Sequence, residues 1–340
     1  MQKGFITSLK LVFVGFCFAL SQAQADESLL AQPEVKTFIQ KMVQTHQFKE
    51  KDLNNWFKYA SIQNKVLERI AKPSEALPWH RYLPIFLTPQ RIDDGVDFWK
   101  KNQAALAKAQ KEYGVSPEII VAIIGVETFY GKKTGDFPVF DCLATLAFRY
   151  PPRSKFFLSE LEQYLLLARE EGWPVRSIKG SYAGAMGMPQ FISSSYRRFA
   201  IDFTGNQKRD LLNSTEDVIG SVANYFKASG WKPGEGVAYP AAISKNVDKM
   251  IAPKQNPIQK YSYAKMSSSG IQLHPDARIT KTKLGDQPLA LIALQEENGM
   301  KYWFGANNFY VITRYNHSDH YAMAVYTLSR KIKDGYLASA

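Results

Sequence analysis

The chain has 340 residues, of which 45% are hydrophobic, and it carries a formal net charge of +12 at pH 7. A chain of this length and apolar content can bury a sizeable core, so the composition excludes a disordered protein and indicates two or three domains. The excess of Lys and Arg favours anionic partners. Nucleic acid is not expected among them, because the basic residues are scattered and no helix-turn-helix, zinc-finger or RNA-recognition signature occurs.

The first 25 residues have the pattern of a secretory signal peptide. Lys3 and Lys10 precede an apolar run over residues 11–20, and Ala23-Gln24-Ala25 provides a small-x-small cleavage site. About ten apolar residues are too few for a membrane span, which needs roughly 20. We therefore expect a periplasmic protein without a transmembrane span, beginning at Asp26. Its charge is 12 − 2 = +10, because the signal contains two Lys and no acid, and the carboxylates of cell-wall peptide stems suit that charge.

The two cysteines are not expected to pair with each other. Cleavage removes Cys17, so Cys142 remains alone in the mature chain. Cys142 lies in an apolar run with no His nearby in sequence, which is typical of a buried small hydrophobe. Cys17 follows the bulky Phe16, where lipid-attachment sites carry a small residue, so a lipid anchor is the less favoured alternative.

From residue 28 to about 110 the sequence predicts amphipathic helices. Apolar residues recur at helical spacing, for example at positions 35, 38, 39 and 42, and prolines break the pattern at 73, 78 and 84. We assign 26–110 to a helical domain. Residues 321–332 return to helical spacing, and a C-terminal helix within 320–340 is expected to complete this domain.

The next segment, 111–231, contains a predicted helix with an acid on its apolar face. Ser116-Pro117 is a typical helix start and Gly131 a plausible end, so we predict a helix from Pro117 to about Tyr130. Three isoleucines precede Glu127 by seven, four and three residues, which puts its carboxylate on the apolar side. Apolar surroundings disfavour the charged form and suit a proton donor, although a salt-bridged structural glutamate fits the spacing equally well.

A glycine-rich stretch follows at residues 180–191. Its three glycines and two alanines allow another surface to approach the backbone closely, while Ser181 and Gln190 offer hydrogen-bonding groups. A packing contact between helices is the alternative interpretation of the small residues.

The composition changes after Trp231. Lys232-Pro233-Gly234 ends the helical pattern, and a segment rich in Pro, Lys, Ser and Gln continues to about residue 275. Asn298-Gly299 then predicts a hairpin turn. Short alternating runs cover 277–283, 288–295 and 301–306. We therefore predict a small antiparallel β domain, with a groove-lining segment, within 232–319.

Four motifs, in one order along nearly the whole mature chain, resemble the lytic murein transglycosylase B family. They are Gly125-Val126-Glu127-Thr128-Phe129-Tyr130-Gly131, then Ser181-Tyr182-Ala183-Gly184-Ala185-Met186-Gly187 with Gln190-Phe191, then Gly220-Ser221-Val222-Ala223-Asn224-Tyr225-Phe226, and finally Asn308-Phe309-Tyr310 with Thr313-Arg314-Tyr315-Asn316. The resemblance implies an α+β fold, mainly α, with a lysozyme-like core at 111–231, a helical domain and a small antiparallel β domain. It also implies that the substrate is the glycan strand of peptidoglycan.

The resemblance assigns one acid/base role to Glu127. Ordinary glycosidases use two carboxylates. In this family a single glutamate protonates the oxygen between N-acetylmuramic acid and N-acetylglucosamine, then accepts the proton of the muramic C6 hydroxyl, which closes a 1,6-anhydro ring. The sugar's N-acetyl group steadies the charge between the steps. Implied groove residues are Ser181, Gln190 and Tyr225, with Tyr82, Asn308 and Tyr315 as weaker candidates.

The chain departs from the family pattern at two places. Ser193 stands where the family has a proline, which affects the local turn rather than the chemistry. Members often carry an EF-hand-like calcium loop, but Gln207 replaces its glycine and Asn213 stands where a closing acid is expected. We expect no cofactor. The weak calcium candidates are Asp202, Thr204, Asn206 and Asp210.

The sequence leaves two other functions open. A muramidase of the same fold would use water and release a reducing sugar, and a non-catalytic cell-wall binding protein would be expected to lack the acid, which is present as Glu127. We expect a monomer. Proteins of cell-wall synthesis or remodelling are possible partners.

Overall fold

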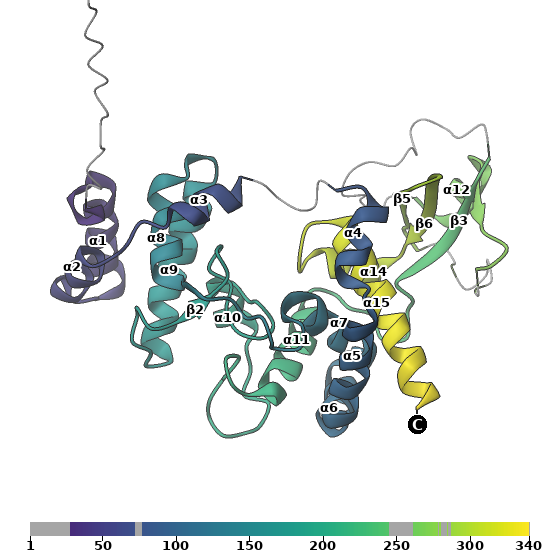
Figure 1. Cartoon of the computed structure of the whole chain (residues 1–340), viewed down its shortest axis with the longest axis horizontal. Helices are drawn as coiled ribbons and strands as arrows, with labels where there is room; N and C mark the ends of the chain where they lie inside the picture. The colour runs from purple at the N-terminus through teal and green to yellow at the C-terminus, as the bar shows by residue number, and fades with distance from the viewer. Residues whose placement is uncertain are drawn as a thin grey trace, which may run out of the picture.

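The computed structural model describes residues 28–71, 77–244, 261–277, 279, 284 and 287–339. The predicted signal peptide lies outside these residues, as does most of the predicted strand 277–283, and both stay predictions. The described part is mainly helical with two antiparallel sheets (Figure 1), which confirms the predicted fold class. Among these residues no helix is long and apolar enough to cross a membrane.

The N-terminal helices pack on a pair formed by α8 (Val139–Arg149) and α9 (Ser154–Glu170), which the short helix η3 (Pro151–Arg153) joins. Aromatic rings carry this contact, since the ring centroids of Phe57 and Phe140 lie 5.2 Å apart. The N-terminal elements are η1 (Leu29–Ala31), α1 (Pro33–His46), α2 (Glu50–Lys58) and α3 (Asn64–Ile70).

The following helices surround α7 (Pro117–Thr128). The rings of Trp99 and Tyr336 stack at 4.2 Å and an interplanar angle of 10°, which docks α15 on α5. The predicted helical domain 26–110 is therefore divided, because its first part covers α8 and its second part covers α7 (Figure 1). The helices of this second group are α4 (Trp79–Phe86), α5 (Pro89–Lys101), α6 (Gln103–Tyr113) and the C-terminal α15 (Asp319–Ala338).

The helix α7 ends two residues before the predicted boundary. Phe129 and Tyr130 both have left-handed backbone conformations, with φ of 53° and 60°, where non-glycine residues are uncommon. The Tyr130 hydroxyl donates a hydrogen bond to the Arg91 carbonyl oxygen at 2.7 Å and its ring lies over Gly125. The tyrosine thus folds back over the last turn of α7 and is held there by α5.

Short elements complete the lysozyme-like core around the glycine-rich stretch. The helix α11 packs on α6, and α10 packs on α9. Two short strands pair antiparallel, with Phe137 opposite Gly180. The elements are β1 (Phe137–Pro138), β2 (Lys179–Gly180), α10 (Ser193–Phe199) and α11 (Thr215–Ala228).

A four-stranded antiparallel sheet with the order β4-β3-β6-β5 forms the predicted β domain. The hairpin turn lies at residues 297–298, one residue earlier than predicted, and Gly299 follows it with φ 121°. The sequence did not predict β3, because a central strand with a proline, Pro240, is unusual. The elements are β3 (Ala238–Ile243), α12 (Tyr263–Ser268), β4 (Ile271–Leu273), β5 (Ala290–Glu296), β6 (Gly299–Gly305) and α14 (Asn307–Thr313).

We predict that Gly125→Ala destabilises the protein. A Cβ atom at this position would lie 2.6 Å from the Tyr130 Oη, so the ring or the helix must shift. Overpacking of this kind costs about 1–3 kcal/mol, and urea unfolding should show that loss. Gly335→Ala is the helical comparison and should cost less, because its Cβ would meet a single methyl group of Val96, at 2.9 Å, rather than a ring. Equal stability of the two variants would contradict the packing that we describe around Tyr130.

Candidate active site

Glu127 lies in the last turn of α7 and receives a hydrogen bond from a tyrosine on α15. The Tyr321 hydroxyl donates to Glu127 Oε1 at 2.5 Å. The tyrosine is 3% exposed, and burial followed by the charge of Glu127 raises its pKa well above 10. Tyr321 therefore keeps its proton at neutral pH and acts as a fixed donor to the carboxylate.

The residue after the acid fastens α7 to the glycine-rich stretch. The Thr128 side chain is 1% exposed, and its hydroxyl donates to the Met188 carbonyl oxygen at 2.7 Å. The Thr128 hydroxyl oxygen also accepts a hydrogen bond from the Gly131 N–H at 3.1 Å. The position of Glu127 relative to this loop is thus set by the neighbouring threonine.

The glycine-rich stretch, residues 180–191, forms a series of turns. It is not the packing contact between helices that was the alternative interpretation. The Ser181 Oγ accepts hydrogen bonds from the N–H groups of Ala183 and Ala185 at 3.3 and 3.1 Å. Gln190 has a φ of 52°, and its Nε2 donates to two carbonyl oxygens, those of Thr134 and Gly187, at 2.9 Å each. Both predicted groove residues are half-buried and hold the loop in shape.

Gly184 and Gly187 are required by this loop for two reasons. Each has a positive φ, at 80° and 68°. A Cβ on Gly187 would lie 2.3 Å from the backbone oxygen of Leu211, and one on Gly184 would meet the side chain of Leu143 at 2.6 Å. The close backbone approach that the sequence suggested therefore occurs here.

An aromatic cluster adjoins the acid. Tyr315 lies 4.9 Å from Tyr225 and 5.8 Å from Phe191, measured between ring centroids, and it stacks on Tyr321 at 6.5 Å. Burial raises the pKa of Tyr315 well above 10, and the charge of Glu127 adds to the effect. The structure thus brings the predicted residues Tyr225 and Tyr315 together beside the acid.

The hydroxyl groups of these two tyrosines bond to the protein. Tyr315 donates to the Pro189 carbonyl oxygen at 2.6 Å, and Tyr225 donates to the Arg314 carbonyl oxygen at 2.5 Å. Tyr225 is 9% exposed and Tyr315 is half-buried. Their contribution to the site is therefore the position and surface of their rings.

Two weaker candidates lie below the surface. Asn308 is 0% exposed, and its amide bonds to both backbone groups of Lys232 and to the Glu235 carbonyl oxygen at 2.9–3.0 Å. Tyr82 is 1% exposed and packs against His320, 5.5 Å between ring centroids. Both side chains are buried in the protein interior.

The predicted calcium residues lie on one loop, which carboxylate oxygens hold together. Asp202 accepts hydrogen bonds from the N–H groups of residues 205, 206 and 207 at 2.6–3.0 Å. The Asp210 carboxylate faces the amide nitrogen of Asn213 at 3.1 and 3.2 Å. The buried Asp217 accepts from the N–H groups of residues 203, 204 and 210. These oxygens serve local hydrogen bonds and a donor occupies the closing position, so the set fits calcium poorly.

Cys142 is fully buried, as predicted, and burial raises the pKa of its thiol to about 12. Its thiolate is therefore strongly disfavoured at neutral pH, which excludes it as a nucleophile.

Sequence reasoning missed Tyr321 and Thr128. The sequence placed Tyr321 only within a predicted C-terminal helix, and Thr128 only within the motif that contains Glu127. An acid on an apolar helix face needs a donor, so the sequence indicated that a partner exists but not which residue supplies it.

The site thus combines a glutamate that has a tyrosine donor with a glycine-rich turn and an aromatic cluster. Residues 30–330 match the family model described as the transglycosylase SLT domain. The chain belongs to this family and is an enzyme of the lytic murein transglycosylase class.

Individual relatives agree in sequence and in fold. The chain is 41% identical over 317 residues to membrane-bound lytic murein transglycosylase B of Escherichia coli (strain K12), covering 88% of this chain and 82% of that protein. It is 42% identical to soluble lytic transglycosylase SltB1 from Pseudomonas aeruginosa, with a TM-score of 0.82 and coverage of 89% and 99%. SltB3 from the same species, in complex with NAG-anhNAM-pentapeptide, is 27% identical, with a TM-score of 0.77 and coverage of 90% and 80%.

We predict that Tyr321→Phe slows the reaction and shifts its pH dependence. The hydroxyl favours the charged form of the Glu127 carboxylate, so its loss favours the protonated form and the alkaline limb of the pH–rate profile should move to higher pH. A hydrogen bond to a charged group contributes about 1.5–3 kcal/mol, so kcat/KM should fall about 10–100-fold.

Tyr326→Phe is the matched control for this experiment. Tyr326 lies on the same helix, is half-buried, and packs against Trp303 at 6.4 Å. Its variant should keep the parent rate and profile. If Tyr321→Phe also keeps both, the tyrosine does not act on the acid.

Proposed function

We propose that the chain cleaves the β-1,4 bond between N-acetylmuramic acid and N-acetylglucosamine in peptidoglycan and releases 1,6-anhydromuramoyl products. The observation that carries this proposal is the single carboxylate of Glu127, held by Tyr321 beside the aromatic cluster. Among the described residues, Glu127 is the one acid whose charge perturbs Tyr315. The relative SltB3, crystallised with NAG-anhNAM-pentapeptide, supports the same product class.

In the first step Glu127 acts as the general acid. Its proton passes to the glycosidic oxygen, the bond from that oxygen to the muramic C1 breaks, and the N-acetylglucosamine end leaves as an alcohol. The positive charge that develops at C1 is met by the oxygen of the sugar's own N-acetyl group. No second carboxylate is needed, in contrast to ordinary glycosidases.

In the second step the same residue acts as the general base. The muramic C6 hydroxyl attacks C1, its proton passes to the Glu127 carboxylate, and the acid is regenerated. Tyr321 donates to Oε1 and therefore supports the charged state that exists between the two steps. Ser181, Gln190 and Tyr225 are proposed to orient the sugars, because they form the loop and the ring surface next to Glu127.

We predict that Glu127→Gln abolishes most of the turnover. Glutamine keeps the shape of the side chain but neither donates nor accepts the proton, so kcat should fall by about 10²–10⁴-fold. Thermal unfolding and retention on insoluble sacculi should stay close to those of the parent. Sacculus clearance at near the parent rate would show that another group performs the chemistry.

A second prediction separates the transglycosylase from a muramidase. A hydroxyl of the substrate itself, held near C1, has a high effective concentration and outcompetes water when the site is well closed. The rings of Tyr225 and Tyr315 supply a closed surface beside the acid. Digestion of sacculi in oxygen-18 water should therefore give anhydromuramoyl products without label by mass spectrometry. Label at the muramic C1 of most products would identify a hydrolase.

A further inference from the structure

A hollow of about 420 Å³ lies between α2 and the end of α9, and it contains none of the residues of the active site. Its volume falls within the usual range for small-ligand sites. Three aromatic rings line it, together with charged side chains from both helices and the segment before α2. These aromatic and charged lining residues are Phe48, Lys49, Asp52, Trp56, Arg169 and Trp173.

Two half-buried tryptophans face this hollow from different elements. Trp56 of α2 is held edge-on by Phe48, with ring centroids 6.2 Å apart. Trp173, after α9, is held edge-on by Tyr196 at 5.4 Å. Among the described residues neither indole N–H takes part in a hydrogen bond or is buried without a partner. Fixed indole faces with accessible N–H groups suit a ligand with apolar ring faces and hydroxyl acceptors.

A fixed guanidinium beside these rings adds a positive charge. Arg169 donates through Nη1 to the His46 carbonyl oxygen at 2.7 Å, and its Cζ lies 4.3 Å from the centre of the Phe48 ring. In the part of the chain that the structure describes, Arg169 has no carboxylate partner. The neighbouring Glu162 is paired with Lys41 and His46 at 2.5 and 2.7 Å. The remaining N–H groups of Arg169 therefore suit an anion on a ligand.

We propose that this hollow is a second glycan-binding site, remote from Glu127, for an aminosugar strand that carries carboxylates. The sugar faces pack on Trp56 and Trp173, and a lactyl or stem-peptide carboxylate pairs with Arg169. The choice of polymer rests on the proposed function. Because that substrate is a long chain, a strand held here makes its engagement by the active site intramolecular, which increases retention without a new contact at Glu127.

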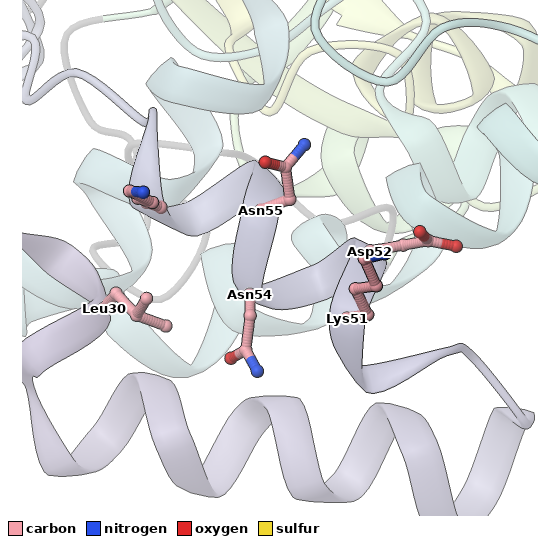
Figure 2. Close-up of a pocket in the computed structure, with 6 residues that line it drawn as sticks. Leu30, Lys51, Asp52, Asn54 and Asn55 are labelled. Carbon is pink, nitrogen blue, oxygen red and sulfur yellow. The ribbon is translucent and has the colours of Figure 1, made fainter.

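A neighbouring hollow of about 390 Å³ is the poorer candidate for sugar binding. It shares Asp52 with the first, and Figure 2 shows the amide groups of Asn54 and Asn55 pointing in different directions from α2. No aromatic ring lines it. The aromatic hollow is therefore the one in which a sugar ring has a surface to pack on.

The test measures binding with the Glu127→Gln protein, so that strands stay intact whichever reaction the active site performs. Adding Trp56→Ala and Trp173→Ala together should weaken binding of long soluble strands by about tenfold, equivalent to about 1.4 kcal/mol. Arg169→Gln should weaken it by a smaller factor. Arg153→Gln is the matched control, because Arg153 stacks on Phe156 at 4.4 Å outside the hollow and should have no effect.

Cleavage of a short muropeptide by the same variants, with Glu127 restored, distinguishes this site from the active site. A tetrasaccharide cannot bridge two remote sites, so its kcat/KM should stay within about twofold of the parent. Equal losses on short and long substrates would overturn the proposal. Because the alanine variants could disturb packing, the indole N–H resonances of Trp56 and Trp173 in the Glu127→Gln protein provide a direct check. Both should shift when strands are added, and the absence of any shift also overturns it.

Three ligands identify the source of the carboxylate. Peptide-free muramyl strands present the lactyl carboxylate, stem-bearing strands present peptide carboxylates, and chitin oligomers present none. Arg169→Gln should reduce binding of the acidic ligand that uses this site and leave chitin unaffected. If chitin binds as tightly as both acidic strands and the substitution changes nothing, the assigned role of the charge is wrong and with it the proposal.

Discussion

The hydrogen bond from Tyr321 to Glu127 is the constraint on which the rest of the site depends. It joins residues 194 positions apart, on α15 and α7. Ten of the twelve residues of α7 are buried, so the carboxylate emerges from an apolar helix at its last turn. A polar group in such surroundings is costly unless it is hydrogen-bonded. The C-terminal helix offsets this cost, because it returns to α7 and places the Tyr321 hydroxyl as a donor to the acid.

Several contacts serve this requirement from different directions. The stack of Trp99 on Tyr336 and the ion pair of Lys333 with Glu118, at 2.8 Å, fasten α15 along α5 and α7. The Thr128 hydroxyl fixes the other side of the acid to the glycine-rich stretch. Domain boundaries drawn along the sequence hide this arrangement, because the acid, its donor and its neighbouring loop come from three separate segments that meet only in the folded chain.

Residues whose role follows from a local sequence pattern could be predicted, whereas residues that act through long-range contacts could not. The position of Glu127 on an apolar face followed from helical spacing, and the loop at 180–191 from its glycines. Tyr321 could not be selected, because the chain has 18 tyrosines and spacing does not say which one returns to α7. Asn308 shows the opposite case. A polar residue in a family motif suggested substrate contact, but in the fold its amide holds the backbone around Lys232.

A single group that must first give and then take a proton needs surroundings that favour neither form too strongly. The apolar face of α7 disfavours the carboxylate, whereas the hydroxyl of Tyr321 favours it. Burial keeps that hydroxyl protonated, so it does not compete with Glu127 for the substrate's proton. The two opposing effects act on one side chain, and neither requires a second acid. A two-carboxylate glycosidase divides the acid and base roles between two residues. Here the surroundings of Glu127 allow one residue to serve both roles.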